Sequence, residues 1–160
     1  MFQNTPFAFE ATLNASPFTF PILEVTHIAS FAIAIGTIAL VDFRLLGLAM
    51  LRQTPGKLAS ATRLWTLLAL STAIFSGLLM YATDPDKFYL NVSFLFKIAC
   101  LILAIAFHYT VHRRIVGGVV QGNAPAAAAI ATACVSLTLW VGVVFGGIFI
   151  EFVKEGLSFS

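Results

Sequence analysis

The first apolar run of the sequence, residues 22–48, carries ionisable side chains at both of its ends. Glu24 and His27 stand near its start, and Asp42 and Arg44 stand near its end. About 20 apolar residues are enough to cross a bilayer, and ionisable groups inside such a span are costly. They are therefore candidates for a functional site, because histidine and carboxylate side chains can transfer protons and histidine can bind haem iron.

A second set of ionisable residues lies on the third apolar run of the sequence. At 100° per residue, Lys97, His108 and His112 share one helical face. His108 comes eleven residues after Lys97, or about 16 Å further along a helix. Helix geometry therefore predicts two separate polar layers. The outer layer comprises Glu24, His27 and Lys97, and the inner layer comprises Asp42, Arg44, His108, His112 and Arg113.

Haem b is the cofactor hypothesis for the outer layer. His27 would be an axial ligand of the iron, and Met80, at a matching depth in the second span, would be the opposite ligand. Lys97 would pair with a propionate. The alternative for this layer is a hydrogen bond from His27 to Glu24, one helical turn away, with no cofactor.

Haem b is also the hypothesis for the inner layer, with His108 as the ligand. Arg44 and the other arginines of this layer would be available for the propionates. His112 cannot be the second ligand, because two histidines one turn apart on one helix cannot lie on opposite faces of a haem. The alternatives are an interfacial pair of Asp42 with Arg44 and a simple basic anchor at His112-Arg113-Arg114.

The composition indicates a membrane protein. The 160 residues are 59% hydrophobic and 10% charged, with a mean hydropathy of +0.96, whereas soluble domains are about 45–50% apolar and about 25% charged. A net charge of +2 gives no support for nucleic-acid binding. Cys100 and Cys134 lie in apolar runs, without the spacing of a zinc site or a disulfide framework.

The apolar runs predict an all-α fold, a single membrane domain over residues 1–160 that forms a four-helix bundle. The expected spans are residues 22–46, 61–81, 88–112 and 126–152, preceded by an interfacial segment at 1–20. Six of the nine Lys and Arg residues lie in or beside the first and third loops. The positive-inside rule then places these loops in the cytoplasm and both termini on the outer, periplasmic side.

Small residues predict close helix packing inside the bundle. Gly142 and Gly146 form a GxxxG pattern in the fourth span, and Ala69, Ala73 and Gly77 form a similar stripe in the second. Such stripes let two helices approach closely where lipid supplies no hydrophobic driving force. Packing within one chain is favoured over a dedicated dimer face.

Three stretches resemble an uncharacterised family of small bacterial four-helix membrane proteins, a domain-of-unknown-function family. The first is LEVTHIASFAIAIGTIALVDFRLLGL, the second is FLFKIACLILAIAFH and the third is SLTLWVGVVFGGIFIEF. The residues that match the first-span pattern are Glu24, His27, Gly36, Asp42, Arg44, Leu45 and Gly47. Some relatives carry Arg near position 148, where this chain has Ile148. The resemblance implies the fold but no activity.

A looser similarity in architecture to cytochrome b561-like and copper-resistance D-type membrane proteins implies haem or copper handling, by analogy alone. The leading functional hypothesis is a haem-b-binding electron-transfer subunit of a redox complex in the bacterial inner membrane. The partner would be another subunit or a second copy, and no catalysis by this chain alone is expected. A cofactor-free anchor or assembly subunit is the alternative, and a small transporter or proton pathway is the third.

Overall fold

The computed structural model describes residues 15–89 and 91–156 and contains helices but no strand within them. The elements in chain order are α2 (Thr19–Leu45), α3 (Pro55–Thr83), α4 (Pro85–Tyr89), α5 (Val92–Phe107), the π-helix η1 (His108–His112), α6 (Arg113–Val120) and α7 (Ala126–Gly156). The three elements α5, η1 and α6 form one continuous rod. Four helical rods are therefore long and apolar enough to cross a membrane, which indicates a multi-pass membrane protein.

The ends of the second and third rods differ most from the sequence prediction. The second rod begins at Pro55 instead of 61, because Pro55 occupies the first helical position and the Thr54 hydroxyl caps the helix by accepting from the Lys57 amide at 3.3 Å. The third rod begins at Val92, after Asn91 caps it, and continues past His112 to Val120. The predicted interfacial segment at 1–20 lies mostly outside the described residues.

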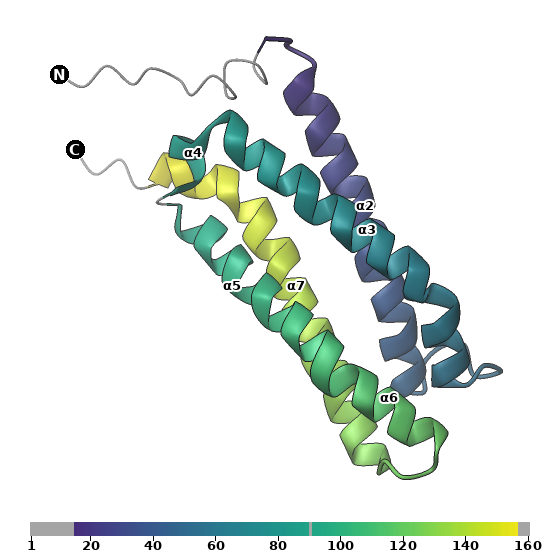
Figure 1. Ribbon diagram of the computed structural model, residues 1–160. Coiled ribbons are helices and arrows are strands. Elements are labelled where there is room, and N and C mark those ends of the chain that lie inside the picture. The colour runs from purple at the N-terminus through teal and green to yellow at the C-terminus, as the bar shows by residue number, and fades with distance from the viewer. Residues whose placement is uncertain (1–14, 90, 157–160) are drawn as a thin grey trace.

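The rods form two antiparallel pairs that meet along one seam (Figure 1). Helix α2 packs on α3, and α5 packs on α7, while α2 and α7 join the two pairs. Helix α3 also contacts α6, but it has almost no contact with α5. The loops at residues 46–54 and 121–125 lie at one end of the bundle, which we call the basic end, and the start of α2 and the end of α7 lie at the other.

The bundle core contains small and apolar side chains from all four rods. Its main cluster comprises Ala34, Ile38, Ala69, Leu70, Ala104, Trp140 and Val143. Many large apolar side chains on the outside are exposed, including Leu64, Trp65, Leu103 and Phe145. An apolar exterior around a small-residue core is the pattern expected of helices that face lipid.

The predicted glycine stripes pack inside the chain. A Cβ atom at Gly146 would come within 3.0 Å of the Lys97 backbone, and one at Gly142 would come within 3.1 Å of the Cys100 sulfur. The GxxxG pattern of α7 therefore packs against α5 and is not a free dimer face. In α3, Ala69 and Ala73 are buried in the same way.

Candidate functional site

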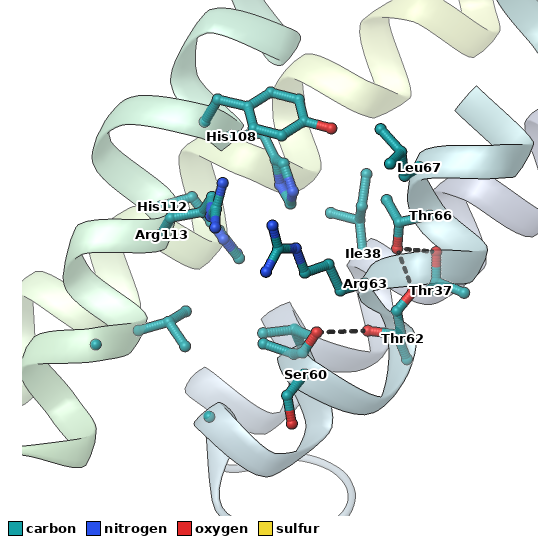
Figure 2. Close-up of a pocket in the computed structure, with 16 residues that line it drawn as sticks. Thr37, Ile38, Ser60, Thr62, Arg63, Thr66, Leu67, His108, His112 and Arg113 are labelled. Carbon is teal, nitrogen blue, oxygen red and sulfur yellow. Dashed lines mark hydrogen bonds between the residues drawn. The ribbon is translucent and has the colours of Figure 1, made fainter. Parts of the chain in front are cut away.

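A cavity of about 330 Å³ lies between α3 and the η1–α6 segment near the basic end, with α2 as its third wall. Figure 2 shows side chains from these elements converging on it. Its charged and aromatic walls are Arg63, His108, Tyr109, His112 and Arg113, and Thr37, Ser60, Thr62 and Thr66 add hydroxyl groups. None of the described residues that line the cavity is acidic. The cavity therefore has a cationic lining without a carboxylate counter-charge.

The π-helix η1 determines how the two histidines of this wall are arranged. It begins at His108 and ends at His112, and their rings stack with centroids 5.0 Å apart and planes 25° apart. Single π-helical turns inside α-helices often occur at functional sites. The buried Nδ1 atom of His108 has no hydrogen-bond partner among the described residues. Buried polar atoms without a partner are rare in folded proteins, so this nitrogen marks the His108 ring, which lines the cavity, as a residue that needs a functional explanation.

Asp42 anchors His112 from behind the cavity. Its fully buried carboxylate accepts a hydrogen bond from His112 Nε2 at 2.7 Å and another from Ser136 Oγ at 2.7 Å. The three residues lie on α2, η1 and α7, so one carboxylate joins three helical elements. Because His112 donates from Nε2, its ring is fixed in place and supports the stacked His108 ring.

Arg63 and Arg113 bring positive charge to the cavity from opposite walls. Figure 2 shows the Arg63 side chain extending from α3 into the cavity toward the histidines of η1. Arg113 follows η1 directly, and its guanidinium lies 5.8 Å from the centre of the Tyr109 ring. Guanidinium groups bind carboxylates and phosphates well, so the cavity favours an anionic ligand.

The outer layer is a separate contact in the other half of the bundle. His27 Nδ1 donates to the backbone carbonyl of Ala73 at 2.8 Å and lies 3.3 Å from Ser76 Oγ. The ring then has its lone pair on Nε2, which accepts from Lys97 Nζ at 3.2 Å. Both ring nitrogens of His27 therefore have partners, and this contact joins α2 to α3 and α5.

The surroundings of this contact fit its two side chains closely. A Cβ atom at Gly77 would come within 3.0 Å of the His27 ring, and one at Gly147 would come within 3.4 Å of Lys97 Nζ. The Phe31 ring stacks against His27 at 5.8 Å and lies 5.9 Å from Lys97 Nζ. The two glycines provide the space that the long side chain and the imidazole occupy.

Three residues predicted for these sites lie elsewhere. Glu24 is exposed, so the alternative hydrogen bond from His27 to Glu24 is wrong, because both ring nitrogens bind α3 and α5 instead. Met80 lies one turn after Ser76 on the same face of α3, and the described residues show no contact between its sulfur and His27. Arg44 donates from Nε to the Gln53 carbonyl at 2.5 Å, a contact with the loop and not with the cavity.

The predicted pair of Asp42 with Arg44 is also wrong, because Asp42 turns into the bundle toward His112. His112 is buried and is not part of a purely basic surface anchor, whereas Arg113 and Arg114 are exposed. The sequence prediction missed Ser136. The available signal was weak: Thr132 and Ser136 are one turn apart in an otherwise apolar helix, and both are buried.

Comparison with curated proteins yields no match, and comparison with solved structures yields none. One family model matches residues 18–153, which cover all four rods and both polar layers. The sequence resemblance to a domain-of-unknown-function family is thereby confirmed. The chain belongs to the Family of unknown function (DUF6644).

Proposed function

We propose that this protein is a haem-b-binding membrane subunit that passes electrons to a partner subunit of a redox complex, with its haem in the cavity at the basic end. The observation that carries the proposal is His108. Its buried Nδ1 is unpaired among the described residues, and its ring stands in the wall of a cavity lined by two arginines. A neutral imidazole beside cationic side chains suits a metal complex that carries carboxylates.

The chain's own residues have distinct tasks in this proposal. His108 would hold the haem iron, and Arg63 and Arg113 would pair with the propionates. His112, fixed by Asp42, keeps the stacked His108 ring in its orientation. When bound, haem b supplies one-electron oxidation and reduction at its iron.

The outer layer is the weaker candidate for haem ligation. His27 would have to give up its contact with Lys97 before Nε2 could bind iron, and the Nδ1 bond to Ala73 would remain as the orienting contact. Met80 would also have to approach from the next turn of α3. The proposal therefore places haem at His108 and keeps His27 and Lys97 as a polar contact between helices.

Absorption spectra of the purified protein, oxidised and reduced, test this proposal. Protein made in haem-replete cells should show a Soret band, and reduction should sharpen its visible bands. The band should be lost in His108→Ala and kept in His27→Ala, which is the matched control in the other layer. A wild-type protein without a Soret band refutes haem binding. If the band is lost in His27→Ala but kept in His108→Ala, the haem ligand is His27 in the outer layer instead of His108.

The orientation in the membrane forms part of the proposal. The basic residues gather at the end of the bundle with the 46–54 and 121–125 loops, so the positive-inside rule places that end in the cytoplasm of a bacterial inner membrane. The haem would then lie in the cytoplasmic half of the bilayer. We expect a thiol reagent that does not cross the membrane to label Arg52→Cys when it is added on the cytoplasmic side and not when it is added on the outer side.

A cofactor-free anchor or assembly subunit is the second candidate. It is favoured by the complete pairing of His27 and of the Asp42 carboxylate, since such contacts can serve only to fix helix register. A proton pathway or transporter is less well supported. An apolar cluster around Ile38, Leu70 and Trp140 lies between the two layers, and the polar contact beside it among the described residues is the hydrogen bond from Thr66 to Thr37 at 2.8 Å.

A further inference from the structure

The end of the cavity that faces the loops is closed by a contact between two helices. Gly56 stands in the first turn of α3 and also lines the cavity. A Cβ atom at this position would overlap the Val120 side chain at the end of α6, at 2.5 Å from Cγ2. The two helices touch here because residue 56 is glycine. This contact separates the cavity from the loops at the basic end.

The side of the cavity is open in the plane of the membrane. Above the contact with α6, helix α3 has almost no contact with α5, so nothing from that rod covers the gap. Leu67 on α3 and Tyr109 on η1 line the cavity and are 49% and 40% exposed. Leu64, three residues before Leu67 on α3, is also exposed. The opening is thus bordered by apolar side chains together with the exposed lining residues Ser60, Arg63 and Arg113.

The lining of the cavity defines the chemistry of what can enter. Ile38, Val41 and Val116 provide an apolar wall, and Arg63 and Arg113 provide cations with no acidic residue among the described lining. An occupant therefore has an apolar body and at least one anionic group.

We infer that the cavity is loaded from the bilayer: an amphiphilic anion dissolved in the membrane enters sideways between α3 and η1, while Gly56 and Val120 close the route from the loops. The identity of the occupant rests on the proposed function, in which it is haem b, a flat apolar ring with two carboxylates. The inferred route depends only on the contact of Gly56 with Val120 at one end of the cavity and on the opening between α3 and η1 at its side.

A nitroxide spin label inside the cavity tests the route. Thr62 lines the cavity and its hydroxyl bonds only to carbonyls of its own helix, so Thr62→Cys is a suitable site on a Cys100→Ala, Cys134→Ala background. In liposomes, molecular oxygen reports contact with lipid, and a water-soluble nickel chelate reports contact with water. Labels at Leu103→Cys, which is exposed on α5, and at Arg52→Cys, in a loop, give the lipid and water reference values.

The expected result is that the Thr62 label behaves as the Leu103 label does, with collisions by oxygen exceeding those by the nickel chelate. Gly56→Leu should raise nickel collisions at Thr62 several-fold, because the larger side chain separates α3 from α6. In the protein that keeps Gly56, a Thr62 label with the same collision rates as the Arg52 label overturns the inference. So does a label that neither reagent reaches, or one that Gly56→Leu leaves unchanged.

A second arm separates this inference from the proposed function. Hemin delivered from donor liposomes should reduce oxygen collisions at the Thr62 label and should not do so in His108→Ala. Oxygen access without any effect of hemin refutes haem as the occupant and leaves the lateral route supported. Nickel access together with a hemin effect refutes the lateral route and leaves haem binding supported.

Discussion

Removal of the Asp42 carboxylate should be the most destabilising single change in the inner layer. Asp42→Ala deletes two hydrogen bonds of 2.7 Å and leaves His112 Nε2 and Ser136 Oγ buried without an acceptor. Hydrogen bonds to a charged group contribute about 1.5–3 kcal/mol each, and breaking a buried pair costs about 3–5 kcal/mol. The expected loss in the free energy of unfolding is about 3–5 kcal/mol.

A graded series makes this prediction specific. Asp42→Asn keeps the shape and one acceptor oxygen for His112, and its amide can donate to Ser136, so about 1–2 kcal/mol is expected. Ser136→Ala leaves one carboxylate oxygen unpaired and should cost a similar amount. Thr110→Ala is the matched control, because this exposed hydroxyl bonds only to the Ala106 carbonyl of its own rod and should change stability by less than about 0.5 kcal/mol.

The assay is SDS-driven unfolding in mixed micelles, followed by circular dichroism. Polar contacts in membrane proteins often contribute only about 0.6 kcal/mol, because the unfolded chain finds other partners in the micelle. The decisive outcome is therefore the order of the losses in the free energy of unfolding. Asp42→Ala should lose most, Asp42→Asn and Ser136→Ala should lose less, and Thr110→Ala should lose least. An Asp42→Ala variant within 1 kcal/mol of wild type would refute the reasoning, since the carboxylate would not be joining three elements.

Three further predictions use the same assay. Gly77→Val should cost about 1–3 kcal/mol, because a side chain here displaces the His27 ring from Lys97; wild-type stability would show that the ring can move freely. Gly36→Ala should stabilise by about 0.5–1 kcal/mol, since nothing lies within 4 Å of an added Cβ; a loss would reveal a neighbour that is absent from the isolated chain. Lys97→Met should stabilise by about 1 kcal/mol, because a cation costs about 2.5–3.5 kcal/mol in a span and recovers less from His27 and Phe31. A loss of more than 1 kcal/mol in that variant would make Lys97 a stabilising contact.

The fold and the division into two layers could be predicted from the sequence because both follow from simple periodicity. Hydropathy gives four spans, and 100° per residue gives the face of each helix. The glycine stripe of α7 was also predicted to pack within the chain, and Gly142 and Gly146 do contact α5. These features depend on residues close in sequence or on helix geometry alone.

The partners within each layer could not be predicted in the same way. The π-helix at His108 inserts an extra residue into a turn, which rotates everything after it, and no local residue type announces that change. Ser136 is an ordinary small polar residue in a membrane helix, and its contact with Asp42 depends on how three helices pack. The preference of His27 for Lys97 over Glu24 likewise depends on the packing of α5.

The Asp42 contact also has a consequence for the order in which the spans assemble. Asp42 belongs to the first span, but its partners lie 70 and 94 residues later in the chain, on the third and fourth. During synthesis, the first span therefore holds a carboxylate in the membrane with neither of these donors present. Asp42 can make both of its hydrogen bonds only after the helix that carries Ser136 has been inserted, so we expect a chain truncated after α6 to leave the first span more exposed to membrane quality control. The buried carboxylate thus forms a contact that only the bundle of four rods can complete.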